Sequence, residues 1–211
     1  MRRHGILFVI SAPSGAGKST LTKLLLSTVS GIEYSISTTT RPIRPGERDG
    51  VDYHFTDVDT FKRLITDGAF LEHAYVHGNY YGTRRETVES TLRNGVDLLL
   101  DIDIQGGRQI RRHLRSEEEP PFSFPLTAVF VFIMPPSMKA LELRLRQRKT
   151  ESEEAIRRRL KNAEEEMQSA KDYDYVLVNE DVEAAAARLA EIVKVERTRA
   201  MGIAIRNEAG R

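Results

Sequence analysis

Residues 6–20 read ILFVISAPSGAGKST: a short apolar run, then a glycine-rich turn, then polar residues. The apolar run from Ile6 to Ile10 is rich in β-forming residues, as expected of a parallel strand that is buried on both faces. After the turn, Leu21, Leu24 and Leu25 recur at helical spacing. This stretch therefore predicts a buried strand, a tight loop and a helix.

The same apolar-strand pattern returns at residues 96–100, 128–133 and 175–178, and a helix-compatible segment follows each run. Buried strands that alternate with helices predict an α/β fold, in which helices cover both faces of a parallel sheet. The first apolar run is shorter than the core of a signal peptide, and no stretch approaches the roughly 20 apolar residues of a membrane helix. We therefore expect no membrane partner.

Composition narrows the class of protein further. The chain has 211 residues, and 32 Lys and Arg against 31 Asp and Glu give a net charge of +1. This balance gives no support for a nucleic-acid partner. The absence of cysteine excludes disulfides, cysteine nucleophiles, iron–sulfur clusters and thiolate zinc sites, and it is compatible with a reducing cytoplasm.

The glycine-rich turn fits a phosphate-binding P-loop, except that Ala12 stands at its first glycine. Gly15 and Gly17 allow a tight backbone whose N–H groups can point at phosphate oxygens, and the following helix N-terminus adds positive potential. Lys18 is expected to reach the β- and γ-phosphates, and the Ser19 hydroxyl to contact Mg²⁺. The predicted ATP-binding residues are Ala12, Pro13, Ser14, Gly15, Ala16, Gly17, Lys18, Ser19 and Thr20.

Two carboxylates, Asp101 and Asp103, follow the buried run at 96–100. Carboxylates at the end of a strand in a P-loop protein can hold Mg²⁺ through water or bind a substrate. We expect Asp101, with Ser19, to serve the metal. His73 and His77 invite a zinc interpretation, but the spacing of a helical zinc motif is absent and the stretch has the pattern of a strand and a turn.

Several segments depart from the strand–helix alternation. Residues 34–83 are rich in Ser, Thr, Arg, Gly and Tyr and are interpreted as an inserted subdomain. Residues 137–165 form a second, helical insertion, with nine basic and four acidic residues between Lys139 and Lys161. Residues 116–126 are expected to be an exposed loop because of their prolines and acidic triplet, and residues 182–211 an amphipathic helix.

Motifs in the first insertion and at the end of the apolar run at 96–100 resemble those of the guanylate kinases. They are STTTRPIRPGE at 37–47, GNYYG at 78–82 and LDID at 100–103, and the likeness runs from the P-loop to residues 179–181. The resemblance implies transfer of a phosphoryl group from MgATP to GMP by a single domain, residues 1–211. Its expected parts are a P-loop NTPase core of three α/β/α layers (1–33, 84–136 and 166–211), a GMP-binding subdomain (34–83) and a helical lid (137–165).

The resemblance also assigns the GMP site. Arg41 and Arg44 match the pair that grips the GMP phosphate, and Tyr53 and Tyr81 match the tyrosines whose hydroxyls complete that grip. Glu72 matches the glutamate that recognises guanine, whose N1–H and amino group form a donor pair that adenine lacks. Further matched GMP contacts are Ser37, Gly82, Thr83 and Asp103.

In the lid, Arg144, Arg148 and Arg159 match arginines that close over the transferring phosphoryl group. Together with Lys18 and Arg41 they form the predicted catalytic set. Lys149 stands where the family usually has a glycine, which puts the flexibility of that hinge in question.

Three alternative functions are less favoured. A guanylate-kinase-like module that only binds protein partners usually lacks the phosphate loop, which is intact here. A kinase for another phosphorylated small molecule would not need Ser37, Glu72 and the GNYYG element together. A GTP-hydrolysing switch would carry an NKxD-type guanine motif, which the sequence lacks.

Overall fold

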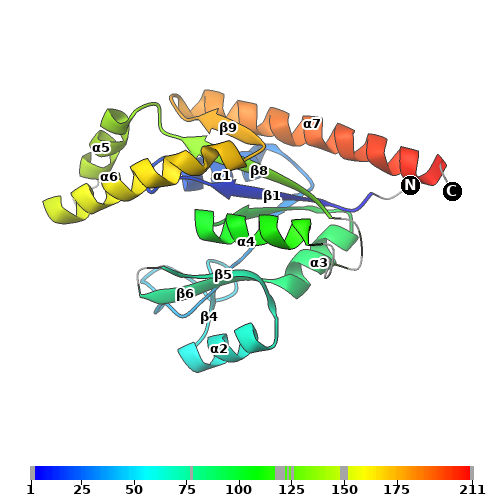
Figure 1. Ribbon diagram of the computed structural model, residues 1–211, viewed down its shortest axis with the longest axis horizontal. Helices are drawn as coiled ribbons and strands as arrows, with labels where there is room; N and C mark the ends of the chain where they lie inside the picture. Colours follow the sequence, from blue (N-terminus) through cyan, green and yellow to red (C-terminus); the bar gives the residue numbers. More distant parts are fainter. Residues whose placement is uncertain are drawn as a thin grey trace.

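A five-stranded parallel sheet forms the centre of the protein (Figure 1). The computed structural model describes residues 3–76, 78–116, 122, 124, 126–147 and 152–209, and side chains as far as residue 201. The sheet has the order β2-β7-β1-β8-β9, and its strands are β1 (Ile6–Ser11), β2 (Ile32–Tyr34), β7 (Asp97–Asp101), β8 (Thr127–Met134) and β9 (Tyr175–Val178). The four predicted strands are confirmed. The fifth strand, β2, was not predicted because it is only three residues long and two of them are exposed.

Helices cover both faces of this sheet, which confirms the predicted three-layer fold. On one face, Ile6, Phe8 and Ile10 pack with α1 (Lys18–Thr28) and α7 (Val182–Ala209). On the other face, Leu7 and Val9 pack with α3 (Arg85–Arg93) and α4 (Ile104–Arg115). Alternate residues of β1 thus enter opposite cores, which explains the continuous apolar run.

A second, four-stranded sheet lies beside α4 in Figure 1. Its order is β4-β3-β6-β5, and its strands are β3 (Thr38–Thr39), β4 (His54–Phe55), β5 (Phe70–Val76) and β6 (Asn79–Arg84). The helix α2 (Val58–Thr66) packs on this sheet through Phe61, whose ring stacks on those of Phe70 and Tyr80 at centroid distances of 4.5 and 5.3 Å.

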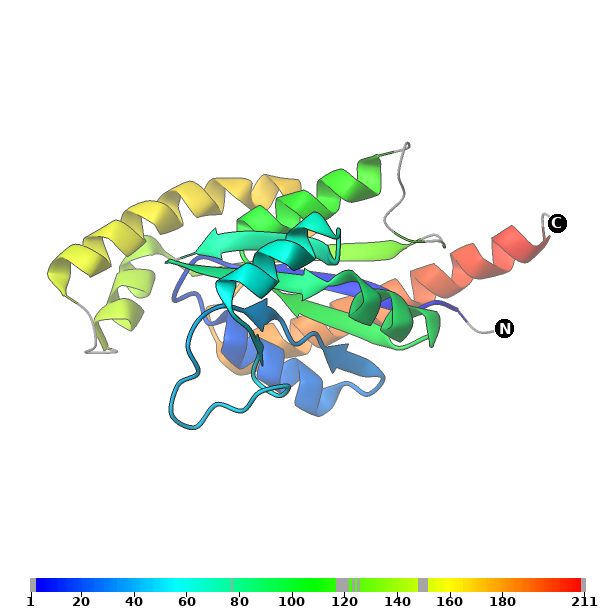
Figure 2. The same ribbon diagram turned by 90° about the horizontal axis from the view of Figure 1, so that it is seen from below.

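Two charged helices, α5 (Met138–Gln147) and α6 (Glu153–Met167), follow β8, and a 3-10 turn, η1 (Gln168–Asp172), precedes β9. Both views show the helix pair extending from the end of the sheet at which the parallel strands finish (Figures 1 and 2). A small apolar cluster of Leu141, Leu145 and Ala163 joins α5 to α6.

The prediction that residues 116–126 form an exposed loop is wrong for the two phenylalanines that the structure describes there. Phe122 is 5% exposed and belongs to the core on the α3 and α4 side. The ring of Phe124 stacks on His4 at a centroid distance of 4.4 Å. Apolar burial of these two rings therefore overrides the polar composition of the segment.

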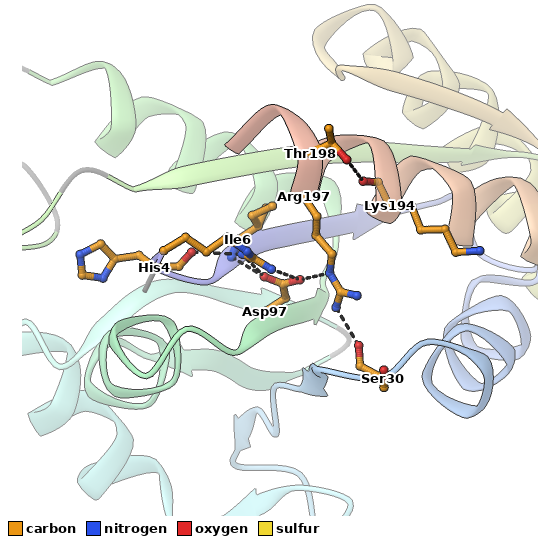
Figure 3. Close-up of polar contacts among 8 residues, drawn as sticks. His4, Ile6, Ser30, Asp97, Lys194, Arg197 and Thr198 are labelled. Carbon is orange, nitrogen blue, oxygen red and sulfur yellow. Dashed lines mark hydrogen bonds and ion pairs between the residues drawn. The ribbon is translucent and has the colours of Figure 1, made fainter. Parts of the chain in front are cut away.

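A charged cluster closes the opposite end of the sheet, where the parallel strands begin (Figure 3). The Asp97 carboxylate is fully buried and accepts hydrogen bonds from Arg3 Nη1 at 2.7 Å, Arg197 Nε at 2.6 Å and the Ile6 backbone N–H at 2.8 Å. Arg197 also donates to the carbonyl oxygen of Ser30 at 2.8 Å. One carboxylate thus ties β7 to the first strand and to the last helix.

Within the described part of the chain, no helix combines the length and the apolar character that crossing a membrane requires.

Candidate active site

The loop between β1 and α1 has the geometry of an anion-binding turn. Gly15 and Gly17 have φ values of +92° and +94°, and the Ala16 N–H donates to the Pro13 carbonyl oxygen at 3.1 Å. Gly17 is the N-cap of α1, and because glycine has no side chain to cap the helix, the first-turn N–H groups stay available to an anion. Ala12, at the first motif position, packs against the core.

Close packing also explains why Gly17 is glycine. A Cβ atom at this position would lie 2.3 Å from Nδ2 of Asn179, a contact that real structures do not tolerate. Asn179 Nδ2 in turn donates to the Ala16 carbonyl oxygen at 2.8 Å, and the Asn179 backbone N–H donates to Met134 at 2.8 Å. Asn179 therefore braces the loop from the end of β9. Sequence reasoning missed this role, although a polar residue directly after a buried strand was a usable signal.

Lys18, the first residue of α1, points to the end of β7. Its ammonium group forms an ion pair with Asp101 and donates to the Ile102 carbonyl oxygen at 2.9 Å. Ser19 and Thr20 are exposed at the start of α1, and Ser14 is exposed in the loop. The predicted loop residues and Asp101 are thus gathered at one edge of the sheet.

A cavity of about 180 Å³ opens between the two sheets. Its walls come from β2, from the second sheet and from the end of β7, and they consist of Tyr34, Ser37, Tyr53, Glu72, Ala74, Val76, Tyr81, Asp101, Ile102 and Asp103. Five of the nine residues predicted for GMP lie in this wall. Tyr34 was missed, because β2 is too short to be recognised in the sequence.

Glu72 is the buried charged group of this cavity. Its side chain lies on β5, it is 4% exposed, and the Thr83 hydroxyl donates to its Oε1 at 2.6 Å. Burial raises the pKa of Glu72 from 4.5 to about 7, although the bond from Thr83 opposes the change. A buried carboxylate in a cavity wall is suited to receive further donors from a ligand.

Asp103 caps α4, since its Oδ1 accepts from the Gly106 N–H at 2.9 Å. Gly82 lies against the ring of Phe70, where a Cβ would be 2.8 Å from Cδ1. Gly82 therefore shapes the strand and is not part of the cavity wall.

Arg41 and Arg44 also lie outside the cavity wall. The Arg41 guanidinium is nearly buried, donates to Glu47 Oε1 at 2.7 Å and stands 5.2 Å from the centre of the Tyr53 ring. This contact lowers the pKa of Glu47. Arg44 is exposed on the loop between β3 and β4, which Figure 2 shows, and its backbone N–H donates to Glu47 Oε2 at 2.9 Å.

A second cavity, of about 560 Å³, borders the phosphate loop. It is lined by the loop, by α5 and by the start of α7, and its residues are Gly15, Gly17, Thr20, Arg144, Gln147, Asn179, Glu180, Asp181, Val182 and Glu183. Arg144 reaches across it and donates to the carbonyl oxygens of Asn179 at 2.9 Å and Ala16 at 3.4 Å.

Of the other arginines predicted for the lid, Arg159 on α6 donates to the Ser14 hydroxyl at 3.0 Å. Arg148 and Lys149 lie outside the residues that the structure describes, as does His77. His73 lies on β5, and no group of three metal-ligating side chains occurs among the described residues.

A phosphate loop that joins a buried parallel strand to a helix, with a second substrate-sized cavity at the same sheet edge, defines a P-loop α/β nucleotide-binding protein. The family model "Guanylate kinase" matches residues 4–196. The chain is 47% identical over 211 residues to the guanylate kinase of Syntrophotalea carbinolica, which covers 100% of this chain and 94% of that one.

Similarity to the guanylate kinase of Desulfotalea psychrophila is 48% identity over 92% of this chain and 91% of the relative. The crystal structure of guanylate kinase from Anaplasma phagocytophilum superposes with a TM-score of 0.71 at 38% identity, covering 93% of this chain and 88% of that one. The chain belongs to the guanylate kinase family.

Proposed function

We propose that this chain transfers the γ-phosphoryl group of MgATP to GMP, giving ADP and GDP, and to dGMP, giving ADP and dGDP, in the cytoplasm, where it serves guanine nucleotide biosynthesis and recycling. Family membership makes the chain an ATP:GMP phosphotransferase. The proposed division assigns ATP to the core (1–33, 84–136 and 166–211), GMP to residues 34–83 and closure to residues 137–165. ATP and GMP are its proposed partners.

The observation that carries this proposal is the buried Glu72 carboxylate in the wall of the smaller cavity. When ionised, it can accept from guanine N1–H and from the exocyclic amino group, while Ser37 offers a hydroxyl in the same cavity. The Thr83 hydroxyl, already bonded to Glu72, holds the carboxylate in place. Adenine would leave the buried acceptor unpaired, which is the arrangement that gives strong discrimination.

The GMP phosphate would lie beside Tyr53 and Tyr81, two residues of the cavity wall whose hydroxyls would donate to it. Arg41 is bonded there to Glu47, and a phosphate would replace or share that partner. Arg44, exposed on the neighbouring segment, would complete a two-arginine grip on the anion. Binding of GMP would therefore bring the Arg44 side chain of this segment to the phosphate.

ATP would place its phosphates on the N–H groups of residues 15–19 and its nucleoside in the larger cavity beside Thr20 and Asp181. Lys18 would turn from Asp101 to the phosphate oxygens, a short move because both lie at the same strand end.

Transfer forms a bond from a GMP phosphate oxygen to the γ-phosphorus and breaks the bond to the β–γ bridging oxygen, which leaves with ADP. Positioning and charge stabilisation supply most of the rate in such reactions. Lys18, Arg41, Arg144, Arg148 and Arg159 would supply the positive charge. Closure of α5 and α6 would exclude water and so prevent hydrolysis of ATP.

The donor set fits Mg²⁺. The Ser19 hydroxyl is exposed at the start of α1, and the Asp101 carboxylate lies at the neighbouring strand end. Mg²⁺ favours such oxygen ligands and keeps several waters, so Asp101 would hold it in part through water. When bound, the ion would neutralise charge on the transferring phosphates.

Production of ADP from MgATP, measured with GMP, AMP, UMP or CMP offered separately, tests this function. We expect turnover with GMP that is lost in Lys18→Ala. Turnover with another nucleotide would contradict the role of Glu72. Binding of GMP without turnover would instead favour a non-catalytic module.

A further inference from the structure

The strand that carries Glu72 is irregular immediately before that residue. In the pairing of β5 with β6, Phe70 lies opposite Arg84 and Glu72 opposite Thr83, so Leu71 is an extra residue on β5. Such bulges re-aim the side chains next to them, and they occur often beside active sites. The direction of the Glu72 carboxylate therefore depends on how this bulge is held.

β5 is also the edge strand of its sheet, so the backbone groups on its free side need partners from elsewhere. The side-chain amide of Gln109 on α4 supplies two of them. Its Oε1 accepts from the His73 N–H at 3.2 Å, and its Nε2 donates to the His73 carbonyl oxygen at 2.7 Å. An amide is suited to this position because it offers a donor and an acceptor side by side, as a neighbouring strand would.

One turn further along α4, His113 Nδ1 donates to the carbonyl oxygen of Leu71 at 3.2 Å. This carbonyl belongs to the extra residue of the bulge. Helix α4 therefore bonds the backbone on both sides of Glu72, at Leu71 and at His73.

Gly106 completes the same face of α4, since residues 106, 109 and 113 follow helical spacing. A Cβ at Gly106 would lie 2.5 Å from Glu72 Oε2 and 3.1 Å from Glu72 Cδ. Glycine is an unfavourable residue inside a helix, so its presence here keeps space for the carboxylate at a cost in helix propensity. We call Gly106, Gln109 and His113 the α4 clamp.

We propose that the α4 clamp is the positioning device for guanine recognition: it holds the bulge of β5 so that the Glu72 carboxylate faces the cavity at a fixed distance from the core. The inference rests on the proposed function, because it concerns the residue that reads the base. The clamp residues touch Glu72 or its backbone neighbours and are positioning residues, not catalytic ones. They also couple the base-reading strand to α4, whose cap Asp103 lies in the same cavity.

The test compares the dissociation constants of GMP and IMP, whose base retains N1–H but lacks the exocyclic amino group. The dissociation constant of GMP would be measured by calorimetry, and that of IMP by its displacement of bound GMP. A displaced Glu72 loses its two-bond fit to guanine, so the preference for GMP over IMP falls by about tenfold, as for loss of one hydrogen bond to a charged group.

Two variants are used because they disturb different members of the clamp. Gln109→Met removes both bonds to His73 at nearly constant volume, and Gly106→Ala places a methyl group against the carboxylate. Arg112→Ala, on the exposed face of the same helix, is the matched control and keeps the wild-type preference. A ratio of dissociation constants is insensitive to the unfolded fraction, so general destabilisation does not imitate the expected result.

A tenfold loss of preference in both variants, with the affinity for ATP changed less than twofold, supports the clamp. A wild-type preference that survives either substitution overturns the clamp and leaves the proposed function standing. Equal affinity of the wild-type protein for GMP and IMP contradicts the proposed recognition by Glu72 and the clamp with it.

Discussion

The two ends of β7 carry the same residue in opposite surroundings. Asp97 begins the strand, is fully buried and accepts bonds from Arg3, Arg197 and a backbone N–H. Asp101 ends the strand, lies in a cavity wall and pairs with Lys18. The first carboxylate has its partners within the fold, whereas the second lines the cavity that we propose for GMP.

The arginines at the two ends of the sheet differ in the same way as the two carboxylates. At the beginning of the sheet, the Arg197 guanidinium meets a carboxylate that is inaccessible to water. At the end, Arg144 donates to backbone carbonyl oxygens, which are neutral. Since a charged anion is a stronger partner than a carbonyl, we expect Arg144 to exchange these bonds for bonds to the phosphate that we propose it contacts. We infer that one end of the sheet serves stability and the other serves chemistry.

The largest effect is expected for Lys18→Ala. Loss of a cation from the phosphate site should lower kcat by about 10³-fold, as for removal of one preorganised transition-state donor. The free energy of unfolding should change by less than about 1 kcal/mol, because the ion pair with Asp101 is partly solvated. Steady-state kinetics and urea unfolding measure both, with the exposed Lys23→Ala on the same helix as control. A large loss of stability would contradict the assignment of this end of the sheet to chemistry alone.

Glu72→Gln should lower kcat/KM for GMP by about 10²-fold, because the amide keeps one acceptor for guanine but offers a donor where the base also donates. The KM for ATP should stay within twofold. Initial rates at varied GMP and fixed MgATP give the comparison. Unchanged kcat/KM would remove Glu72 from guanine recognition.

Arg197→Leu should lower the free energy of unfolding by about 2 kcal/mol, because the buried Asp97 charge loses one of its two arginines. This corresponds to a fall in Tm of roughly 4–8 °C for a chain of this size. The value of kcat at 25 °C should be unchanged. Arg188→Leu, at an exposed position of α7, is the matched control for thermal unfolding. A fall in kcat without a fall in Tm would contradict the assignment.

The pH dependence of GMP binding should be the smallest of these effects. The pKa of Glu72 is raised to about 7, so the ionised form that guanine needs predominates above that pKa and is lost as the pH falls through it. The kcat/KM for GMP should therefore fall about tenfold per pH unit well below 7. The GMP phosphate titrates near pH 6, and Glu72→Gln keeps that step while removing the one near 7. A profile that is identical in the two proteins would refute the role of Glu72.

The buried strands and the phosphate loop could be predicted because their signals are local. A continuous apolar run and a glycine-rich turn before a helix each fix a conformation within about ten residues. The resemblance to the guanylate kinases, which the motifs at 37–47, 78–82 and 100–103 carry, assigned Ser37, Tyr53, Glu72, Tyr81 and Asp103 to the GMP site, and the structure brings all five into one cavity wall.

The features that the sequence did not predict all depend on contacts between distant segments of the chain. β2 is held as a strand by pairing with β7, and Phe122 is buried by a core that its own segment does not reveal. Asn179 and Gln109 matter because of the backbone groups they reach, at Ala16 and His73. Such partners lie more than 30 residues away, where neither periodicity nor spacing carries information.

The same substitution at both ends of β7 tests most directly whether one end of the sheet serves stability and the other serves chemistry. The two variants are Asp97→Asn and Asp101→Asn, and each is assayed for kcat at 25 °C and for its free energy of unfolding. We predict that Asp97→Asn loses about 3 kcal/mol of stability and keeps kcat within twofold. Asp101→Asn should keep its stability within about 1 kcal/mol and lose kcat by about 10²-fold. Equal loss of activity in both variants, or a stability loss confined to Asp101→Asn, would contradict the account.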